Sequence, residues 1–187
     1  MEEETNYLFV DAETDGLYGR FISIAMVYAD SSGNELEHCY IGLKDPKKHI
    51  TDNWVSENVL PLMGEYDSVE DEQSLLENAW LFWRAHAHNT YVITDVMYPV
   101  ESRLFSQCVA FDMFNRNVQA PFPILDLSSM LYSIGINPLE ERGKMIQSLD
   151  KSGKHNALYD ARQTLAVWKK YILPKLQNVK RNNDEYR

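Results

Sequence analysis

Two carboxylates stand two residues apart near the start of the chain, in the segment FVDAE at residues 9–13. Side chains at positions i and i+2 of a strand point to the same face, so Asp11 and Glu13 are expected side by side where a strand ends. Two ionised carboxylates that close together repel each other unless a cation lies between them or one takes up a proton. Hard oxygen ligands of this kind suit magnesium or manganese. The pair predicts a divalent-metal site, although two solvated loop acids would give the same pattern.

A second reactive segment, HNALYDAR, covers residues 155–162. Five residues on one helix correspond to about 500°, so His155 and Asp160 would point apart if they shared a helix. The expected arrangement places His155 on the preceding loop, Asn156 near the N-cap, and Asp160 in the first turns. Histidine suits the role of a base because its unperturbed pKa is roughly 6.5. A lone histidine before a helix is more often a surface or capping residue. The presence of Asp160 in the same segment and of a separate acidic pair favours a catalytic role for His155.

The elements that must position these groups follow from the hydrophobic pattern. Strands over residues 7–11, 21–29 and 36–42, separated by turns, predict an antiparallel meander. The later elements are a short helix near 55–62 within a loop, a helix over 75–87, a strand over 91–94, a helix from Pro99 to Phe114, a strand over 122–125, a helix over 127–133, and a final helix over 156–175 that kinks or ends near Pro174. Trp80 and Trp83 are expected in the core rather than as a base-stacking platform. This order predicts a mixed α/β domain.

Composition sets outer limits on the class of protein. The chain has 187 residues, 44% hydrophobic and 25% charged, which fits one globular domain. The longest apolar run, at 21–29, is too short to cross a bilayer, and no signal-peptide pattern opens the chain, so a cytoplasmic protein without a membrane partner is expected. Cys39 and Cys108 have no CxxC spacing and are expected as reduced thiols. A net charge of −10 disfavours binding of nucleic acid by bulk electrostatics, but it is compatible with an enzyme that meets phosphate through bound cations.

The order of the motifs is specific: DxE, then an aspartate after the fourth strand, then HxAxxDA on the final helix. It resembles that of the DEDD exonucleases of the ribonuclease H-like superfamily, in the DnaQ-like subclass that uses histidine. The sister subclass carries a tyrosine four positions before the last aspartate, and that position here is Asn156. The resemblance runs from residue 7 to about 173. It implies one DnaQ-like exonuclease domain over 1–187, with a short basic tail from about 175. It also implies a ribonuclease H-like α/β fold, in which a mixed five-stranded sheet of three antiparallel and two parallel strands is flanked by helices.

The resemblance also implies a reaction. It implies that Asp11, Glu13 and Asp160 bind two Mg²⁺ or Mn²⁺ ions and that His155 is the general base, and Asp95 is the candidate for the remaining metal-binding acid. The substrates would be the 3′ ends of single-stranded RNA or DNA, or short oligonucleotides, hydrolysed to nucleoside 5′-monophosphates. The terminal nucleotide would lie against the residues that surround the first motif: Ala12, Gly16 and Leu17. Relatives that pair as homodimers make a homodimer a further expectation.

The middle motif departs from the family pattern. The segment after the fourth strand reads TDVMYPVE at residues 94–101. A register without gaps puts Asp95 where the family has asparagine and Pro99 where it has aspartate. Asp95 is the preferred third acid because it closes an apolar strand near the expected metal site. Glu101, on the first turn of the next helix, is the alternative, unless it is only a solvated acid at a helix start.

Two other classes of function stay open at this point. One is a nucleic-acid-binding or interaction module on the same fold with weakened catalysis, and the other is a ribonuclease H-like nuclease that cuts internally. Retention of Asp11, Glu13, His155 and Asp160 disfavours the first, and the final His–Asp pair disfavours the second. The basic residues Lys175, Lys180 and Arg181 would contact a nucleic-acid backbone or form a solvated tail. Arg162 would hold a phosphate or a surface salt bridge.

Overall fold

A six-stranded mixed sheet lies at the centre of the computed structural model, which describes residues 4–147 and 153–184, with side chains to residue 178. The order of its strands across the sheet is β4-β3-β2-β1-β5-β6. The strands are β1 (Asn6–Thr14), β2 (Phe21–Ala29), β3 (Glu35–Leu43), β4 (Asp67–Val69), β5 (Thr90–Thr94) and β6 (Ile124–Asp126). The helices are η1 (Pro46–Lys48), α1 (Asn53–Asn58), η2 (Leu60–Leu62), α2 (Glu72–His86), α3 (Val100–Ala110), α4 (Met113–Arg116), α5 (Leu127–Ser133), α6 (Arg142–Met145), α7 (Ala157–Tyr171) and α8 (Leu173–Asp184).

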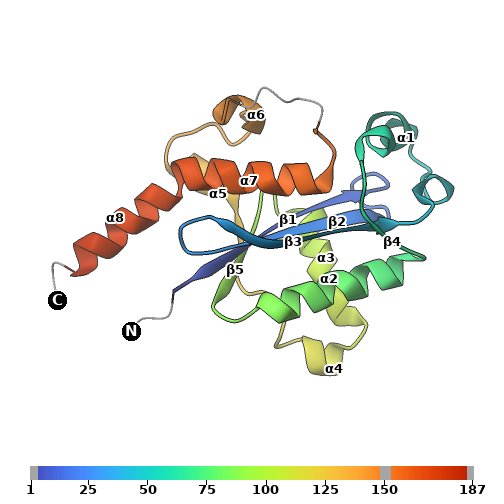
Figure 1. Cartoon of the computed structure of the whole chain (residues 1–187), viewed down its shortest axis with the longest axis horizontal. Coiled ribbons are helices and arrows are strands. Elements are labelled where there is room, and N and C mark those ends of the chain that lie inside the picture. Colours follow the sequence, from blue (N-terminus) through green and yellow to red (C-terminus); the bar gives the residue numbers. More distant parts are fainter. Residues whose placement is uncertain (1–3, 148–152, 185–187) are drawn as a thin grey trace.

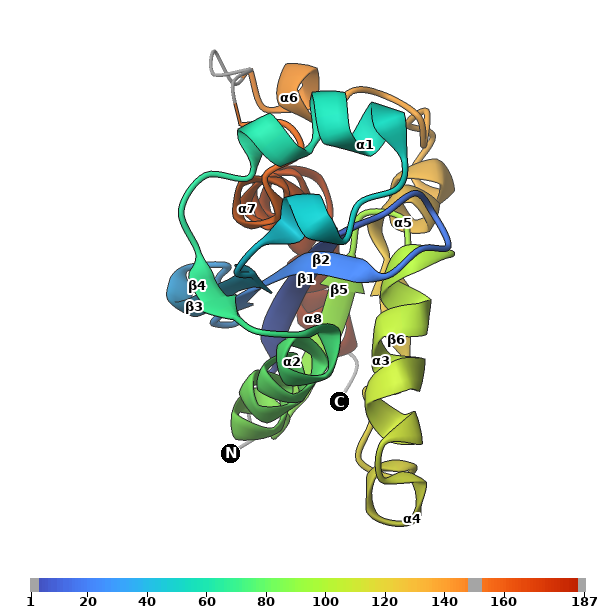
Figure 2. The same cartoon turned by 90° about the vertical axis from the view of Figure 1, so that its right-hand side faces the viewer.

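The pairing of the strands confirms the expected ribonuclease H-like arrangement. Strands β1, β2 and β3 form the antiparallel meander, and β5 and β6 continue the sheet in parallel with β1. The short β4 adds a sixth strand, parallel to β3, in the segment 44–72 that the sequence predicted as mostly loop. Helices α2 and α3 cover one face of this sheet, and α5 and α7 cover the other (Figures 1 and 2).

Alternation along β1 decides where its acids point. Leu8 and Val10 face the core beneath α2 and α3, whereas Tyr7 and Phe9 pack against Trp168 of α7. Asp11 therefore continues the row that faces α7. The strand continues to Thr14. The acidic pair therefore lies within the strand, whereas the sequence predicted it at the end of a strand.

The edge of β1 toward β5 is open beyond its middle. The parallel pairing of β1 with β5 ends at Val10 and Thr94, because the chain leaves the sheet at Asp95. The backbone N–H and C=O groups of residues 11–14 on that side need other partners. This opening admits side chains from the loop after β5 and from the start of α3 to the acidic pair.

Two further predicted boundaries were wrong. Helix α3 ends at Ala110, so Phe114 is not part of its buried stripe and is 90% exposed. Strand β6 begins at Ile124 rather than at Phe122, which is exposed before a cis proline bond. In both cases apolar residues extended the pattern past the point where the chain leaves the core.

The final helix breaks where the proline predicted. Helix α7 ends at Tyr171, and α8 begins at Leu173 with Pro174 in its first turn, where a missing N–H costs nothing. The segment from about 175, expected as a short basic tail, continues as α8 to Asp184. The side chains of Lys180 and Arg181 lie outside the described residues.

Several core predictions are confirmed. Trp80 and Trp83 are buried in the cluster beneath α2, so they are not a base-stacking platform. Cys39 and Cys108 are free thiols. Among the described residues, no helix is long and apolar enough to pass through a bilayer.

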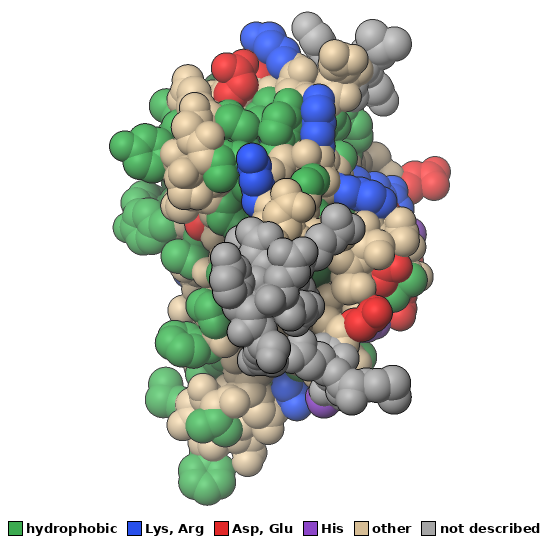
Figure 3. All heavy atoms as spheres, turned by 90° about the vertical axis from the view of Figure 1, so that its left-hand side faces the viewer, with side chains coloured by type: hydrophobic (Ala, Val, Ile, Leu, Met, Phe, Trp, Pro, Cys, Tyr) green, Lys and Arg blue, Asp and Glu red, His purple; other side chains and the backbone are tan. Residues whose placement is uncertain are grey.

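Exposed apolar side chains gather around α4, at Met113, Phe114 and Val118. Helix α4 lies at the end of the molecule opposite to α1 and α6 (Figure 2), and hydrophobic side chains are visible along that end in the space-filling view (Figure 3).

Candidate active site

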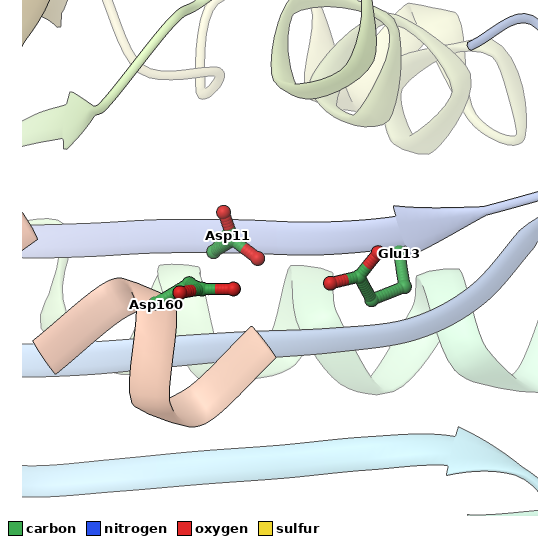
Figure 4. A group of neighbouring side chains, drawn as sticks. All are labelled: Asp11, Glu13 and Asp160. Atoms are coloured by element: carbon green, nitrogen blue, oxygen red, sulfur yellow. The ribbon is translucent and has the colours of Figure 1, made fainter. Parts of the chain in front are cut away.

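Three carboxylates converge between the sheet and the start of α7. Asp11 and Glu13 extend from β1, and Asp160 extends from α7 toward them (Figure 4). Each offers an oxygen, and these oxygens all lie within 4.8 Å of one another. Three hard oxygen donors at this separation match the ligand set of Mg²⁺ or Mn²⁺.

Small residues around the acids allow this approach. Across the β1–β2 pair, Asp11 lies opposite Ala25 and Glu13 lies opposite Ser23, so no large side chain fills the same face beside them. On the helix, Ala157 is fully buried and packs against Ala25 and Tyr40. The alanine allows the first turn of α7 to lie close to the sheet, which is what brings Asp160 within reach of Asp11.

Burial and mutual repulsion make these acids hard to ionise in the metal-free protein. Burial, followed by the charges of Glu13, Glu101, Asp160 and Asp95, holds the pKa of Asp11 well above its usual range. Burial and the Asp160 charge raise the pKa of Glu13 to about 7. Burial raises the pKa of Asp160 to about 6, although the His155 N–H and the Lys154 charge oppose the shift. A bound cation would relieve this repulsion, so the three acids fit a metal electrostatically as well as geometrically.

Asp95, the preferred middle acid, is engaged elsewhere. Its Oδ1 accepts a hydrogen bond of 2.7 Å from Nε of Arg142. The Arg142 guanidinium is buried and also donates to Ser128 Oγ and to the backbone oxygens of Pro138 and Glu140. Asp95 is close enough to act on the pKa of Asp11, but it is not one of the three acids whose oxygens converge.

Glu101, the alternative, is buried at the open edge of β1. It is 7% exposed, and its carboxylate lies close enough to the backbone N–H groups of Ala12 and of Glu101 itself for them to lower its pKa. The Ala12 N–H lies at this open edge because β5 no longer pairs with β1 beyond Val10. Burial raises the pKa of Glu101 to about 8, and the charges of Asp95 and Glu13 add to the shift. The solvated helix-start interpretation of Glu101 is therefore wrong.

The histidine lies where the sequence predicted, on the residue before the N-cap of α7. Asn156 caps the helix by accepting a hydrogen bond from the Tyr159 N–H. His155 has a φ of +67°, a left-handed conformation that is uncommon for a residue with a side chain, and its N–H donates to Asp160 Oδ2 at 2.9 Å. Burial, with a smaller effect of Lys154, lowers the pKa of His155. The imidazole is thus predominantly neutral at neutral pH and free to accept a proton.

The segment around helix α1 contacts both the turn after the Asp11–Glu13 pair and the start of α7, and the sequence did not predict these contacts. The Asp15 carboxylate accepts hydrogen bonds from the Thr51 N–H, the Thr51 hydroxyl and the Asp52 N–H. Asp52 in turn caps α1 through the N–H groups of Trp54 and Val55. At the other end of the segment, the Asn156 amide donates to the Met63 oxygen at 2.6 Å. Residues 51–63 therefore bridge the turn after Glu13 and the start of α7.

Trp54 of this bridge lies against the histidine. Its ring stands edge-on to the His155 ring, with the centroids 5.3 Å apart and the planes at 90°. More than half of the Trp54 side chain is exposed. Asp52, as a capping residue, could have predicted helix α1 from the sequence. No local signal in the sequence predicts the contact between the Trp54 indole and His155, which lie far apart along the chain.

The residues expected to meet the terminal nucleotide surround the turn after β1. Leu17 is 62% exposed, and Gly16 has a φ of +70°, which suits glycine. Ala12 is buried in the core cluster beneath α2 and α3, and its backbone N–H lies near Glu101. Arg162 points away from this group and forms a salt bridge of 2.7 Å with Glu35, the second of its two expected roles.

Comparison with known proteins finds neither a matching family model nor a matching curated sequence. Solved structures do match. The zinc-bound E. coli ExoI–ssDNA complex has a TM-score of 0.66 at 14% identity, over 93% of this chain and 43% of that one. The nuclease domain of 3′hExo, a DEDDh family member bound to rAMP, has a TM-score of 0.63 at 12% identity, over 95% and 94% of the two chains.

This chain has the fold of the DEDDh exonucleases. S. pombe Pop2p, in a form with Mg²⁺ and Mn²⁺ bound, shares it with a TM-score of 0.60 at 14% identity, over 88% of this chain and 83% of that one. The chain spans less than half the length of the E. coli exonuclease I chain. The DnaQ-like, ribonuclease H-like fold that the motif order predicted is thus confirmed.

Proposed function

We propose that the protein is a metal-dependent 3′→5′ exonuclease that removes nucleoside 5′-monophosphates from single-stranded ends. The observation that carries this proposal is the convergence of Asp11, Glu13 and Asp160 beside a histidine of lowered pKa. Structures that share the fold include E. coli exonuclease I in a complex with single-stranded DNA and the nuclease domain of 3′hExo bound to rAMP. A binding module would not need a cluster of mutually repelling buried acids together with a neutral histidine.

Asp11, Glu13 and Asp160 would hold Mg²⁺ or Mn²⁺, as a pair of ions. Bound there, the ions would polarise the scissile phosphate, lower the pKa of water and neutralise charge on the leaving oxygen. The fit rests on the three convergent oxygens and on the raised pKa values of all three acids.

Glu101 would supply the fourth acid. Its carboxylate is buried beside the Ala12 backbone and raises the pKa of Asp11 more than Asp95 does. Asp95 would instead hold Arg142 and thereby position the wall of the site that Arg142 braces. A glutamate at the first turn of α3 can occupy the place of an aspartate on a slightly different path, because its extra methylene lengthens its reach.

His155 would act as the general base. It would take a proton from the attacking water as the water oxygen bonds to phosphorus and the bond from phosphorus to the 3′-oxygen of the preceding nucleotide breaks. Its backbone N–H is fixed on Asp160 and its ring is flanked by Trp54, so the imidazole is held beside the acids. A general base of this kind contributes about 10²- to 10⁴-fold to the rate.

The terminal nucleotide would lie over the turn after β1. Gly16 allows the backbone to turn there, and the exposed Leu17 offers an apolar surface to a base. A cluster of cations bound by buried acids explains how a protein of net charge −10 could hold a polyanion.

The test is hydrolysis of 5′-labelled single-stranded RNA and DNA with Mg²⁺ or Mn²⁺. We expect products that shorten by one nucleotide at a time and release nucleoside 5′-monophosphates, with no activity in chelator. Internal fragments without a ladder would favour an internally cutting nuclease. Binding of the labelled strand with no shortening at any metal concentration would favour the nucleic-acid-binding module.

A further inference from the structure

The turn after β1 is bound to the segment before α1 through the carboxylate of Asp15. Its oxygens accept hydrogen bonds from the Thr51 N–H at 2.9 and 3.0 Å, from the Thr51 hydroxyl at 2.7 Å and from the Asp52 N–H at 2.8 Å. Asp15 and Thr51 are 36 residues apart along the chain. Hydrogen bonds to an ionised carboxylate are among the stronger ones in proteins, so Asp15 fixes the point at which α1 begins.

Asp52 connects this contact to the helix itself. One of its carboxylate oxygens caps α1 by accepting from the N–H groups of Trp54 and Val55, at 2.8 and 3.2 Å. The other oxygen lies over Gly16, where an added Cβ would be only 3.2 Å away. Helix α1 has six residues, and a helix this short is marginal in isolation. Its first turn therefore depends on Asp52, and through it on Asp15.

The first turn of α1 determines where the Trp54 ring lies. Val55 and Val59 belong to a buried apolar cluster that includes Ile22 of β2, so one face of the helix is held on the sheet. Trp54 points about 100° away from Val55 around the helix, and its ring stands edge-on to the His155 ring. Helix α1 lies near the start of α7 in both ribbon views (Figures 1 and 2). The carboxylate contacts thus hold the end of α1 from which Trp54 reaches the histidine.

We propose that Asp15 is a positioning residue for the reaction. By holding the first turn of α1, it keeps the Trp54 ring against the His155 imidazole. The inference rests on the proposed function, in which that imidazole is the base. The N–H of His155 is fixed on Asp160, but the orientation of its ring depends on what packs against the ring. A displacement of a reacting group by about 1 Å can cost about 10²-fold in rate, so a loosened Trp54 should slow the transfer of the proton.

Asp15 also stands two residues after Glu13 on the same segment. A substitution at Asp15 would lower activity by another route if it displaced that metal-binding acid. Two kinds of measurement separate the routes. One observes Trp54 without any catalysis, and the other asks whether the effect on kcat requires the Trp54 ring.

Fluorescence observes Trp54 directly. The other three of the four tryptophans are at most 4% exposed: Trp80, Trp83 and Trp168. Trp54 is 55% exposed, so acrylamide, a neutral quencher, acts mainly on its indole. Asp15→Asn should raise the quenching constant of the exposed fraction, because the ring leaves the His155 imidazole and becomes more accessible.

Asp30 provides the matched control. It accepts hydrogen bonds from the N–H groups of Ser32 and Asn34 and from the Asn34 amide, so it orders the turn after β2 as Asp15 orders the turn before it. Both carboxylates are half-buried, and their turns lie at opposite ends of β2. Asp30→Asn should lower Tm about as much as Asp15→Asn does, but it should leave acrylamide quenching and kcat unchanged.

Kinetics on the 5′-labelled single strand test the link to the base. Asp15→Asn should lower kcat about tenfold and change KM less than about twofold. In a Trp54→Ala background the same substitution should lower kcat by a further factor of less than about two, since the ring that it positions is absent. The increase in Tm with Mn²⁺ should persist in Asp15→Asn.

Thr51 offers a milder variant in case Asp15→Asn misfolds. Thr51→Val removes one of the donors to Asp15 and should lower kcat about threefold. Thr51→Ser keeps the hydroxyl and should retain wild-type kcat and quenching. Equal kinetics in the two Thr51 variants would contradict the proposal.

The remaining outcomes each decide between the hypotheses. Losses from Asp15→Asn and Trp54→Ala that multiply would mean that Asp15 acts through Glu13, and they would overturn the proposal. Unchanged quenching in Asp15→Asn, or a raised KM with unchanged kcat, would overturn it while the exonuclease proposal stands. If the wild type shortens no strand with Mg²⁺ or Mn²⁺, the proposed function is wrong, and the role of Asp15 in the reaction is lost with it.

Discussion

Asp95 and Arg142 form an ion pair of 2.7 Å at the wall of the acid site, and the arginine is buried. An arginine held in this way neutralises much of the charge that Asp95 would offer to a cation. Glu101, by contrast, is surrounded by backbone N–H groups and by the like charges of Asp95 and Glu13. The two candidates for the middle acid therefore differ in what surrounds them, and their neutral analogues should differ in effect.

Glu101→Gln should lower the rate of hydrolysis about 10²-fold or more, because bound cations supply several kcal/mol of transition-state stabilisation. The substitution removes the charge of Glu101 and retains the shape of its side chain. Steady-state kinetics over a range of Mn²⁺ concentrations would measure the loss. Wild-type kinetics in Glu101→Gln would show that this acid does not bind metal.

Asp95→Asn should reduce stability more clearly than catalysis. It leaves a buried guanidinium with a neutral acceptor, which costs on the order of 2 kcal/mol in the free energy of unfolding. Denaturant titration measures this cost, and we expect a loss of activity of about tenfold or less. A stable but inactive Asp95→Asn would instead support Asp95 as the metal ligand, the assignment that the sequence favoured.

Asp11→Asn should abolish hydrolysis and yet stabilise the metal-free protein at pH 8. Asp11 is buried among like charges that raise its pKa, so removal of its charge relieves repulsion. Differential scanning calorimetry in chelator should show a higher Tm than for the wild type, and added Mn²⁺ should no longer raise it. A lower Tm in chelator would mean that Asp11 contributes to packing rather than to a cation site.

The acids also predict how stability depends on pH. Glu13, Asp160 and Glu101 have pKa values of about 7, 6 and 8 in the folded protein, above those of an unfolded chain. Between about pH 4.5 and 8 the folded state therefore binds more protons than the unfolded state, and the metal-free protein should lose stability as pH rises. Saturating Mg²⁺ or Mn²⁺ should remove most of this loss, so the increase in Tm on adding metal should be larger at pH 8 than at pH 5.5.

Thermal unfolding from pH 5 to 8, with metal and with chelator, measures this dependence. Asp15, Asp30 and Asp71 have lowered pKa values, and their contribution disappears only below their ordinary pKa, at the acid end of the scale. They do not mask the effect. Metal-free stability that increases from pH 5 to 8 would contradict the prediction.

The sequence predicted the features that depend on hydrophobic periodicity and on short motifs. The alternation along β1 places Asp11 and Glu13 on one face, and the N-cap at Asn156 places His155 before α7, because both depend on neighbours a few residues away. The middle acid could not be assigned in this way. Its identity depends on where β5 leaves β1 and on the partner of Asp95, which is Arg142, far along the chain. The sequence also failed to predict the extent of α8 and the exposure of Phe114, because composition alone does not determine where a helix ends.

His155→Gln should lower kcat about 10²- to 10⁴-fold, the usual loss of a general base. Metal binding should persist, because the contact of residue 155 with Asp160 is made by the backbone N–H. The increase in Tm with Mn²⁺ would test this second point. A variant that loses both activity and metal stabilisation would show that the imidazole itself is a ligand.

The contact between Trp54 and His155 predicts a shift in the pH profile. Burial lowers the pKa of His155, and the Trp54 ring supplies part of that burial at 5.3 Å. Trp54→Ala should therefore raise the pKa of the imidazole toward 6.5 and move the acid limb of the kcat profile to higher pH. Trp54→Phe, which keeps an aromatic ring there, should move it less. If Trp54 instead contacts only the substrate, Trp54→Ala would raise KM and leave the acid limb in place, and a profile of that kind would separate the indole from the chemistry of the base.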